Sequence, residues 1–387
     1  MRVGIIGYGS RMRLMVDLMQ RLSAGTVITA ITELDPDATR RNLAEHGIDP
    51  TSVHLYTDAD EMLCNEELDG VMIGTRCSSH ARLAIKVLAR NLPLFLEKPV
   101  ATNMDDLCAL REAAKVSLSP VVVSFPLRVT PIIKLAKEII DSGKIGSVEH
   151  VQAINNVPYG YCYYMGWYRD ENETQGLWLQ KATHDFDYIN YLLQARPISV
   201  AAISSKRVYK GDKPAGLRCA ECKDWDTCIE SPYHLYYSRS ETERVENNDR
   251  FCGFAQDTGN EDCGSAIVEY ENGVHASYSQ NFLVRRGAAK RGAILIGYKG
   301  TIEFDWYRDE LTVHMHHTPR VETYKIDSKN ASHGGGDIVL VDNFVRLMRG
   351  EGTSVAPLEA GITSALLCLK AKQAAMERNW QEVRFPD

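Results

Sequence analysis

The chain has 387 residues, of which 44% are hydrophobic and 25% charged, a composition typical of folded globular proteins and not of disorder. This length exceeds one ordinary core, so we expect two domains. A net charge of −7 argues against a nucleic-acid partner or an anionic membrane surface, and no apolar run is long enough to span a membrane. The N-terminal apolar run is too short for a signal peptide, so we expect a cytoplasmic protein whose ten cysteines stay reduced.

Residues 1–125 carry short apolar runs separated by amphipathic helical patterns such as His80–Arg90. Such runs are typical of buried parallel strands. Strands alternating with helices of that length predict βαβ units in a doubly wound parallel sheet, and therefore a Rossmann-type NAD(P)-binding domain. The predicted strands are Val3–Ile6, Val27–Thr32, Val71–Gly74, Leu94–Leu96 and Val121–Ser124.

The pattern changes within residues 126–387, from about residue 145. Polar and apolar residues alternate over Ser265–Tyr278 and Gly292–Trp306, and Asn272-Gly273 is a strong hairpin signal. We therefore expect an α+β domain for substrate binding and oligomerisation, with a large, open-faced, mostly antiparallel sheet. Its two clearest helical patterns cover residues 176–193 and 357–378.

Residues 206–264 show little periodicity and are predicted to form a long excursion from this sheet. The excursion contains a Cys-x-x-Cys pair, Cys219 and Cys222, followed by Cys228 and Cys252. Four thiolates on a loop-rich segment could hold a structural zinc ion in a closed tetrahedral site. The spacing lacks a second Cys-x-x-Cys and Cys263 competes with Cys252, so ordinary reduced cysteines are the alternative.

A glycine-rich turn, Gly7-Tyr8-Gly9, follows the first predicted strand and leads into a helix. The first glycine permits a tight turn, and the second lets the backbone approach a pyrophosphate at the helix N-terminus. Met12 stands where the dinucleotide fingerprint has its third glycine. A purely structural turn is the alternative interpretation.

Glu33 ends the second predicted strand, at the distance expected for the acidic residue that binds the adenosine ribose. A carboxylate there favours the 2′-hydroxyl of NAD and repels the 2′-phosphate of NADP. Asp35 is a rival for this role, and the nearby Arg40 and Arg41 leave NADP open.

Lys98 lies in Leu96-Glu97-Lys98-Pro99, after the fourth predicted strand. Pro99 biases Lys98 away from a helix, which places it at the carboxyl end of a strand, where ligands bind in open α/β sheets. A lysine there could orient a hydroxyl and stabilise negative charge on its oxygen.

The chain resembles the glucose–fructose oxidoreductase / inositol dehydrogenase / MocA family over nearly its whole length. The resemblance implies NAD- or NADP-dependent oxidation or reduction of a secondary alcohol or ketone of a sugar, polyol or related ring. The matching segments are Gly7–Gly9, Thr75–His80, Glu97–Pro99, Arg128 with Pro131, Gly143–Gly146, Trp167–Arg169, His184–Asp187, Gly297–Thr301 and His333–Asp337.

The resemblance also implies roles for individual residues. Lys98 would bind substrate and the nicotinamide region, and His184 would be the catalytic general base. The expected cofactor contacts are Gly7, Gly9, Ser10, Arg11, Glu33, Thr75, His80, Glu97 and Lys98. The expected substrate contacts are Arg128, Trp167, Arg169, Gln180 and Asp187.

Helical spacing places Gln180, His184 and Asp187 on one face of the predicted helix, suitable for a base with an orienting carboxylate behind it. One residue departs from the family pattern: Gln180 stands where many family dehydrogenases have an aspartate. Lys181, one residue further along, should point about a quarter-turn away from this face.

Two other functions remain open. An NAD-dependent glycoside hydrolase would oxidise the sugar transiently and regenerate NAD, and a sugar-sensing regulator would keep the fold without catalysis. We expect a small carbohydrate-like partner, and a homodimer or homotetramer, because an uncovered apolar sheet face favours pairing.

Overall fold

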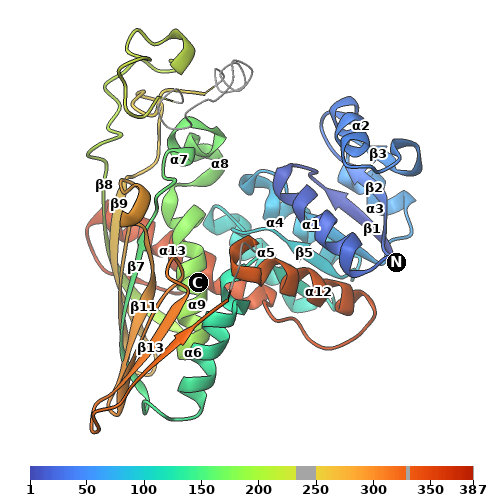
Figure 1. Ribbon diagram of the computed structural model, residues 1–387. Coiled ribbons are helices and arrows are strands. Elements are labelled where there is room, and N and C mark those ends of the chain that lie inside the picture. The colour runs from blue at the N-terminus through green and yellow to red at the C-terminus, as the bar shows by residue number, and fades with distance from the viewer. Residues whose placement is uncertain (232–249, 328–331, 387) are drawn as a thin grey trace.

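The computed structural model of the chain describes residues 1–231, 250–327 and 332–386. Two sheets, each with its own helices, form two lobes, and helix α12 (Gly336–Met348) lies beside the first lobe although it is late in the sequence (Figure 1). The predicted fold class, a Rossmann sheet followed by a mostly antiparallel sheet domain, is confirmed.

The first sheet has six strands in the order β3-β2-β1-β4-β5-β6, and every pairing is parallel. All five predicted strands are present, and the short edge strand β3 is an addition. The central strands are apolar throughout because helices cover both faces of a doubly wound sheet. The strands are β1 (Arg2–Ile6), β2 (Val27–Thr32), β3 (His54–Tyr56), β4 (Gly70–Ile73), β5 (Leu94–Leu96) and β6 (Val121–Val123); the helices are α1 (Ser10–Leu22), α2 (Pro36–Glu45), α3 (Ala59–Asn65), α4 (His80–Leu88) and α5 (Met104–Val116).

The second sheet has nine strands in the order β14-β13-β12-β11-β7-β10-β9-β8-β15. Only the central pair, β7 with β10, is parallel. The strands are β7 (Val148–Asn156), β8 (Pro197–Ser205), β9 (Cys263–Tyr270), β10 (His275–Asn281), β11 (Lys290–Gly297), β12 (Gly300–Asp305), β13 (Glu310–Met315), β14 (Val321–Lys325) and β15 (Gln381–Glu382).

Helices cover one face of this large sheet and leave the other face uncovered (Figure 1). Helix α6 (Pro131–Asp141), α9 (Thr183–Leu193) and α13 (Leu358–Glu377) lie on the covered side. Along β9 buried and exposed residues alternate strictly, as expected for a sheet with one solvated face. Ile203 and Ile267 are 67% and 47% exposed on the open face.

Helix α12 packs on the Rossmann sheet and not on its own domain's sheet. Phe344 of α12 meets Phe95 of β5 edge to face at 5.9 Å between ring centroids. A Cβ on Gly70 of β4 would come within 2.6 Å of the Met348 sulfur, so the backbone and this helix are in close contact. Residues 1–125 and α12 therefore share one core.

The predicted excursion begins where β8 ends and returns to the sheet at β9, and residues 232–249 of it lie outside the described residues. Within the described parts it is mostly irregular. Small helices α7 (Cys162–Met165) and α8 (Glu171–Thr174) lie next to it (Figure 1). In the portion of the chain that the structure describes, no helix has the length and apolar character needed to cross a membrane.

Candidate active site

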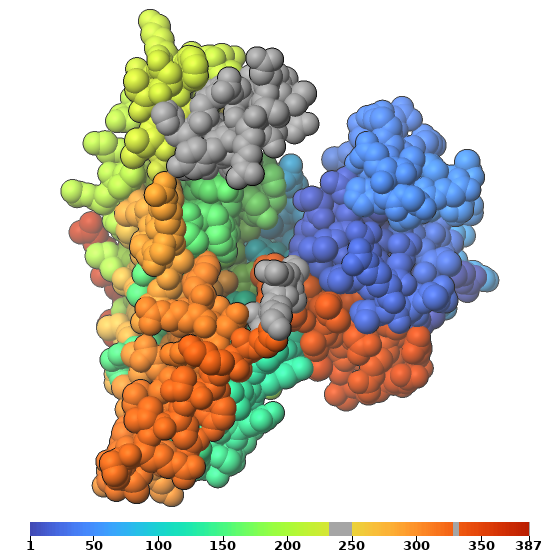
Figure 2. All heavy atoms as spheres, viewed as in Figure 1, coloured from blue at the N-terminus to red at the C-terminus, as the bar shows by residue number. Residues whose placement is uncertain are grey.

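A cavity of about 1150 Å³ lies between the two lobes, and Figure 2 shows the hollow between the N-terminal lobe and the rest of the molecule. Its Rossmann wall is formed by the carboxyl ends of β1, β2, β4 and β5, the edge where open α/β sheets bind ligands. The facing wall comes from the segment before α9 and from the loop after β7.

The glycine-rich turn forms one end of this cavity. Gly7 has φ +87°, and a Cβ there would come within 2.7 Å of the Thr75 backbone nitrogen, so only glycine fits. A Cβ on Gly9 would meet no atom within 4 Å, so the space above it is open to a ligand. Ser10 begins α1, whose first turn has no acidic residue. This geometry fits the pyrophosphate of a dinucleotide at a helix N-terminus.

Glu33 lines the cavity directly after β2. Its Oε1 accepts a hydrogen bond from the Tyr8 backbone N–H at 2.5 Å, and its Oε2 accepts one from the Leu34 N–H at 3.1 Å. The carboxylate therefore lies beside the glycine turn, where the ribose of a bound dinucleotide is expected. Asp35 instead caps α2 through the Ala38 N–H, and Arg40 pairs with Asp37.

His80 connects two loops of the Rossmann wall. Its ring is 1% exposed, with Nδ1 2.8 Å from the carbonyl oxygen of Pro99 and Nε2 3.1 Å from that of Thr75. Both loops line the cavity, so His80 holds the Thr75 and Lys98 segments in place. His80, which we expect to contact the cofactor, thus uses both ring nitrogens to hold these two loops in position.

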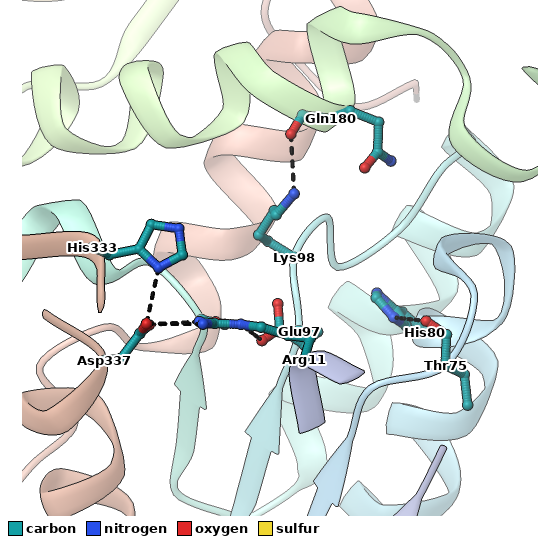
Figure 3. A network of polar contacts seen from close by, with 9 residues as sticks. Arg11, Thr75, His80, Glu97, Lys98, Gln180, His333 and Asp337 are labelled. Carbon is teal, nitrogen blue, oxygen red and sulfur yellow. Dashed lines mark hydrogen bonds and ion pairs between the residues drawn. The ribbon is translucent and has the colours of Figure 1, made fainter. Parts of the chain in front are cut away.

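Arg11 is engaged in a network that joins the two lobes (Figure 3). Its guanidinium binds Glu97 at 2.9 Å and both carboxylate oxygens of Asp337 at 2.6 and 2.9 Å. His333 contacts the same Asp337 carboxylate through Nδ1 at 2.9 Å. Arg11 and Glu97 reach the cavity surface, but their charged groups bind each other.

Lys98 extends from the Rossmann wall towards the facing helix (Figure 3). Its Nζ donates a hydrogen bond to the backbone carbonyl oxygen of Gln180 at 3.0 Å. Burial lowers the pKa of this ammonium group from its ordinary value. Lys98 is therefore held at the centre of the cavity, within reach of both lobes.

His184 lies in the first turn of α9 and lines the same cavity. Burial, helped by the charge of Lys98, holds the pKa of His184 well below its ordinary value, so the ring is neutral near pH 7. Its buried Nδ1 has no hydrogen-bond partner among the described residues. A neutral imidazole with an unpartnered buried nitrogen beside a cavity is suited to accept a proton.

Gln180 has one free hydrogen-bonding group at the cavity. Its Nε2 contacts the Cys77 sulfur at 3.2 Å, whereas its buried Oε1 has no partner within the described part of the chain. Gln180 is 1% exposed and lines the cavity. The amide oxygen can therefore accept a hydrogen bond from a bound ligand.

Lys181, which we expect about a quarter-turn away from the face of Gln180 and His184, also lines the cavity. Trp178–Ala182 forms a π-helical turn directly before α9, and such a turn shifts side-chain directions relative to an α-helix. Gln180, Lys181 and His184 consequently all line the cavity. The Lys181 ammonium donates to the Tyr159 hydroxyl and lies 4.7 Å from that ring's centroid.

Three of the five expected substrate contacts lie away from the cavity lining. Arg128 forms a buried two-point ion pair with Asp187, with Nη2–Oδ1 at 2.5 Å and Nε–Oδ2 at 3.0 Å, which joins the segment before α6 to α9. Arg169 pairs with Asp257 in the excursion. Trp167 does line the cavity, stacked between Tyr168 and the Arg76 guanidinium.

Four of the five cysteines of the excursion, Cys219, Cys222, Cys228 and Cys252, come together around a small cavity of about 20 Å³. Burial raises the pKa of Cys219 to about 12, which favours a protonated thiol. Across residues 1–231, 250–327 and 332–386, no group of three or more His, Cys, Asp or Glu side chains is arranged to hold a metal ion. The clustering agrees with the zinc hypothesis, whereas the arrangement of the thiols does not support it.

Comparison with known families identifies the chain. Residues 1–125 match the oxidoreductase family model with an NAD-binding Rossmann fold, and residues 133–303 match the GFO/IDH/MocA C-terminal domain. The chain belongs to the GFO/IDH/MocA oxidoreductase family. In this family member, residues 1–125 form the NAD-binding Rossmann domain.

Curated relatives of this GFO/IDH/MocA chain include the oxidoreductase YteT of Bacillus subtilis, 28% identical over 84% of this chain and 83% of that protein. A 1-carboxy-3-chloro-3,4-dihydroxycyclohexa-1,5-diene dehydrogenase of Comamonas testosteroni is 27% identical over 52% of this chain and 50% of its own length. The inositol 2-dehydrogenase of Corynebacterium glutamicum is 25% identical over 52% and 56%. The alignments with these two named dehydrogenases thus span about half of each protein.

Solved structures share the whole fold. Levoglucosan dehydrogenase in complex with NADH and levoglucosan covers 99% of both chains, with a TM-score of 0.77 and 18% identity. An oxidoreductase domain protein from Kribbella flavida has a TM-score of 0.78 and 17% identity, covering 100% of this chain and 99% of its own. At these identities the comparison concerns the fold alone.

Proposed function

We propose that the protein transfers hydride between NAD and a secondary alcohol of a sugar, polyol or related ring. The observation that carries this proposal is that Lys98, His184 and the Gly7–Gly9 turn line one continuous cavity. Bound NAD would accept or donate the hydride at its nicotinamide ring. Relatives named for inositol and for a dihydroxylated ring, which carry vicinal or ring hydroxyls, support this substrate class.

In the proposed oxidation, neutral His184 removes the proton of the substrate hydroxyl. The Lys98 ammonium stabilises the negative charge that develops on that oxygen. Gln180 Oε1 accepts a hydrogen bond from a neighbouring hydroxyl of the ring. Trp167 and Tyr168 supply a stacked aromatic surface at the cavity wall.

The proposal specifies NAD rather than NADP. Glu33 places a carboxylate beside the glycine turn, where it would accept hydrogen bonds from the ribose and repel a 2′-phosphate. Neither Arg40 nor Arg41 lines the cavity, and Arg40 already binds Asp37.

The decisive experiment measures NADH and free sugar together. Purified protein is incubated with NAD and a panel of free sugars, polyols and their glycosides. A dehydrogenase accumulates NADH in proportion to the oxidised product. Release of free sugar from a glycoside without net NADH would instead identify the redox-cycling hydrolase, and tight binding of NAD and sugar without either product would identify a regulator.

A further inference from the structure

Two lysines, Lys98 and Lys181, face the same cavity from opposite walls. Lys181 is 6% exposed and lies in the π-helical turn before α9, one residue after Gln180. The protein therefore places a second ammonium group at the substrate end of the cavity, beside an uncharged glutamine.

Neither lysine forms an ion pair within the described part of the chain. Lys98 donates to a backbone carbonyl oxygen and Lys181 to the phenol of Tyr159. Asp185, whose charge acts on Lys181, is already saturated. Its Oδ1 accepts from Arg291 Nε at 2.8 Å, and its Oδ2 accepts from Asn155 at 2.7 Å and from Tyr278 at 2.9 Å.

The carboxylates that line this end of the cavity also have partners. Glu97 binds Arg11, and Glu173 accepts a hydrogen bond from Ser78 at 2.5 Å. Glu33 and Asp58 lie at the other end, beside β2 and α3. The substrate end thus combines two lysines with His184, and among the described residues neither lysine is ion-paired with Glu97 or Glu173.

A buried ammonium group without a counter-ion is costly, so it either loses its proton or binds an anion. Burial and the nearby Arg291 lower the pKa of Lys181 to about 7, against the opposing effects of Asp185 and Cys162. Both charge states are therefore accessible near neutral pH. An anionic ligand would favour the protonated state and would be bound by a charge-assisted hydrogen bond.

We propose that the polyhydroxylated substrate, cyclic as in a uronate or open-chain as in an aldonate, carries a carboxylate, and that Lys181 binds this carboxylate while Lys98 and His184 face the reacting hydroxyl. This inference rests on the proposed function and adds the chemical class of the substrate. A neutral polyol would leave both lysines without a counter-ion in the cavity. Tyr159, which accepts the hydrogen bond from Lys181, orients the ammonium group from the loop after β7.

The test compares acids with their neutral counterparts in the protein loaded with NADH, in which an alcohol binds without reacting. Calorimetric titrations use three pairs: D-galacturonate with D-galactose, D-glucuronate with D-glucose, and D-gluconate with D-glucitol. The acid of at least one pair is expected to bind about tenfold or more tightly, which corresponds to about 1.4 kcal/mol. Lys181→Met and Lys181→Gln should both remove this preference.

Lys137→Met is the matched control, because Lys137 is also buried but pairs with Asp141 on α6, outside the cavity. It should retain the preference for the acid. Equal or tighter binding of every neutral partner, binding of no ligand of the three pairs, or an unchanged preference in both Lys181 variants would overturn the inference. Failure to bind NADH at all would overturn the proposed function itself, so the two failures are distinguishable.

Discussion

The Nζ of Lys98 donates a hydrogen bond to the backbone carbonyl oxygen of Gln180 across 3.0 Å, and this contact joins the two walls of the cavity. A substrate oxygen that competes for the same ammonium group would lie between the Rossmann sheet and α9. In the proposed reaction, both domains would therefore set the position of the reacting hydroxyl.

Replacing Lys98 by alanine should reduce turnover by about a hundredfold or more, because the charge that stabilises the developing oxyanion is lost. NAD affinity should change much less, since the glycine turn and Glu33 remain. Steady-state kinetics with the identified substrate, together with a thermal melt to verify folding, measures both effects. Near-normal turnover in the variant would exclude Lys98 from the chemistry.

His184→Ala should likewise slow oxidation by about a hundredfold or more, as expected for the loss of a general base. Because the pKa of His184 lies well below the usual value, its basic form persists as pH falls through 6.5. The wild-type rate should consequently show no loss attributable to this histidine between pH 8 and about 6.5. A rate that halves near pH 6.5 and loses that step in His184→Ala would contradict the assignment of a neutral, buried base.

Glu33→Ala should weaken NAD binding by about 1–3 kcal/mol, the usual contribution of a charge-assisted hydrogen bond. NADP binding should change in the opposite direction, because the repulsion of the 2′-phosphate disappears. Fluorescence titration of both cofactors checks the change in their ratio. Asp35→Ala is the control and should leave that ratio unaltered, and tighter binding of NADP than NAD by the unmodified protein would refute the role of Glu33.

Asp337→Asn should lower the free energy of unfolding by about 2 kcal/mol, because it removes one of the two buried carboxylates that pair with Arg11 and leaves only Glu97. Arg2→Met, which removes an exposed ion pair with Glu67, should cost less than about 1 kcal/mol. Thermal melts of both variants give the comparison. Equal melting temperatures for Asp337→Asn and the wild type would show that this network does not stabilise the fold.

The Arg11–Asp337 ion pair also predicts how the stability of the fold depends on pH. Although burial acts in the opposite direction, hydrogen bonds from Arg11 and His333 hold the pKa of Asp337 well below its ordinary value. A carboxyl group with a depressed pKa stabilises the fold above its unfolded value, about 4, and loses this contribution as pH falls further. The stability difference between wild type and Asp337→Asn should therefore be constant from pH 7 to 5 and shrink below about pH 4.

We expect the open face of the nine-stranded sheet to pair with a second copy of the chain. Ile267 and Ile203 lie exposed on neighbouring strands of that face, and Ile154 and Ile294 are half-buried on it. Ile267→Asp should shift the mass measured by light scattering towards the monomer, whereas Leu118→Asp, at an exposed apolar residue of the Rossmann domain, should not. A wild-type protein that is monomeric at micromolar concentration would contradict this expectation.

The sequence was most informative where local physics decides the structure. Short apolar runs predicted all but one strand of the Rossmann sheet, since strands buried on both faces leave little room for polar residues. Alternation and the Asn272-Gly273 turn predicted the hairpin of β9 and β10. Gly7, Lys98 and His184 were found through turn chemistry and family resemblance, and all of them line the cavity.

Other features depend on contacts that no local pattern encodes. Helical spacing assumed a regular α-helix and did not indicate the π-helical turn at Trp178–Ala182, nor that Lys181 lines the cavity together with Gln180. Arg128 and Asp187 are 59 residues apart in the sequence and form a buried ion pair. Their spacing along the chain does not indicate this pairing.

The packing of helix α12 limits where the chain can be exchanged with another family member to make a chimaera. Phe344 and Met348 of α12 cover the apolar surface at Phe95 and Gly70. A gene fragment that stops at residue 125 would therefore encode a Rossmann domain in which this surface is exposed to solvent. A chimaera that exchanges the substrate-binding half must retain α12 from the parent that supplies the Rossmann sheet. Because α13 also packs on α5 and β6, hybrids that keep both α12 and α13 from the parent of the Rossmann sheet should fold, whereas a single junction near residue 125 should yield insoluble ones.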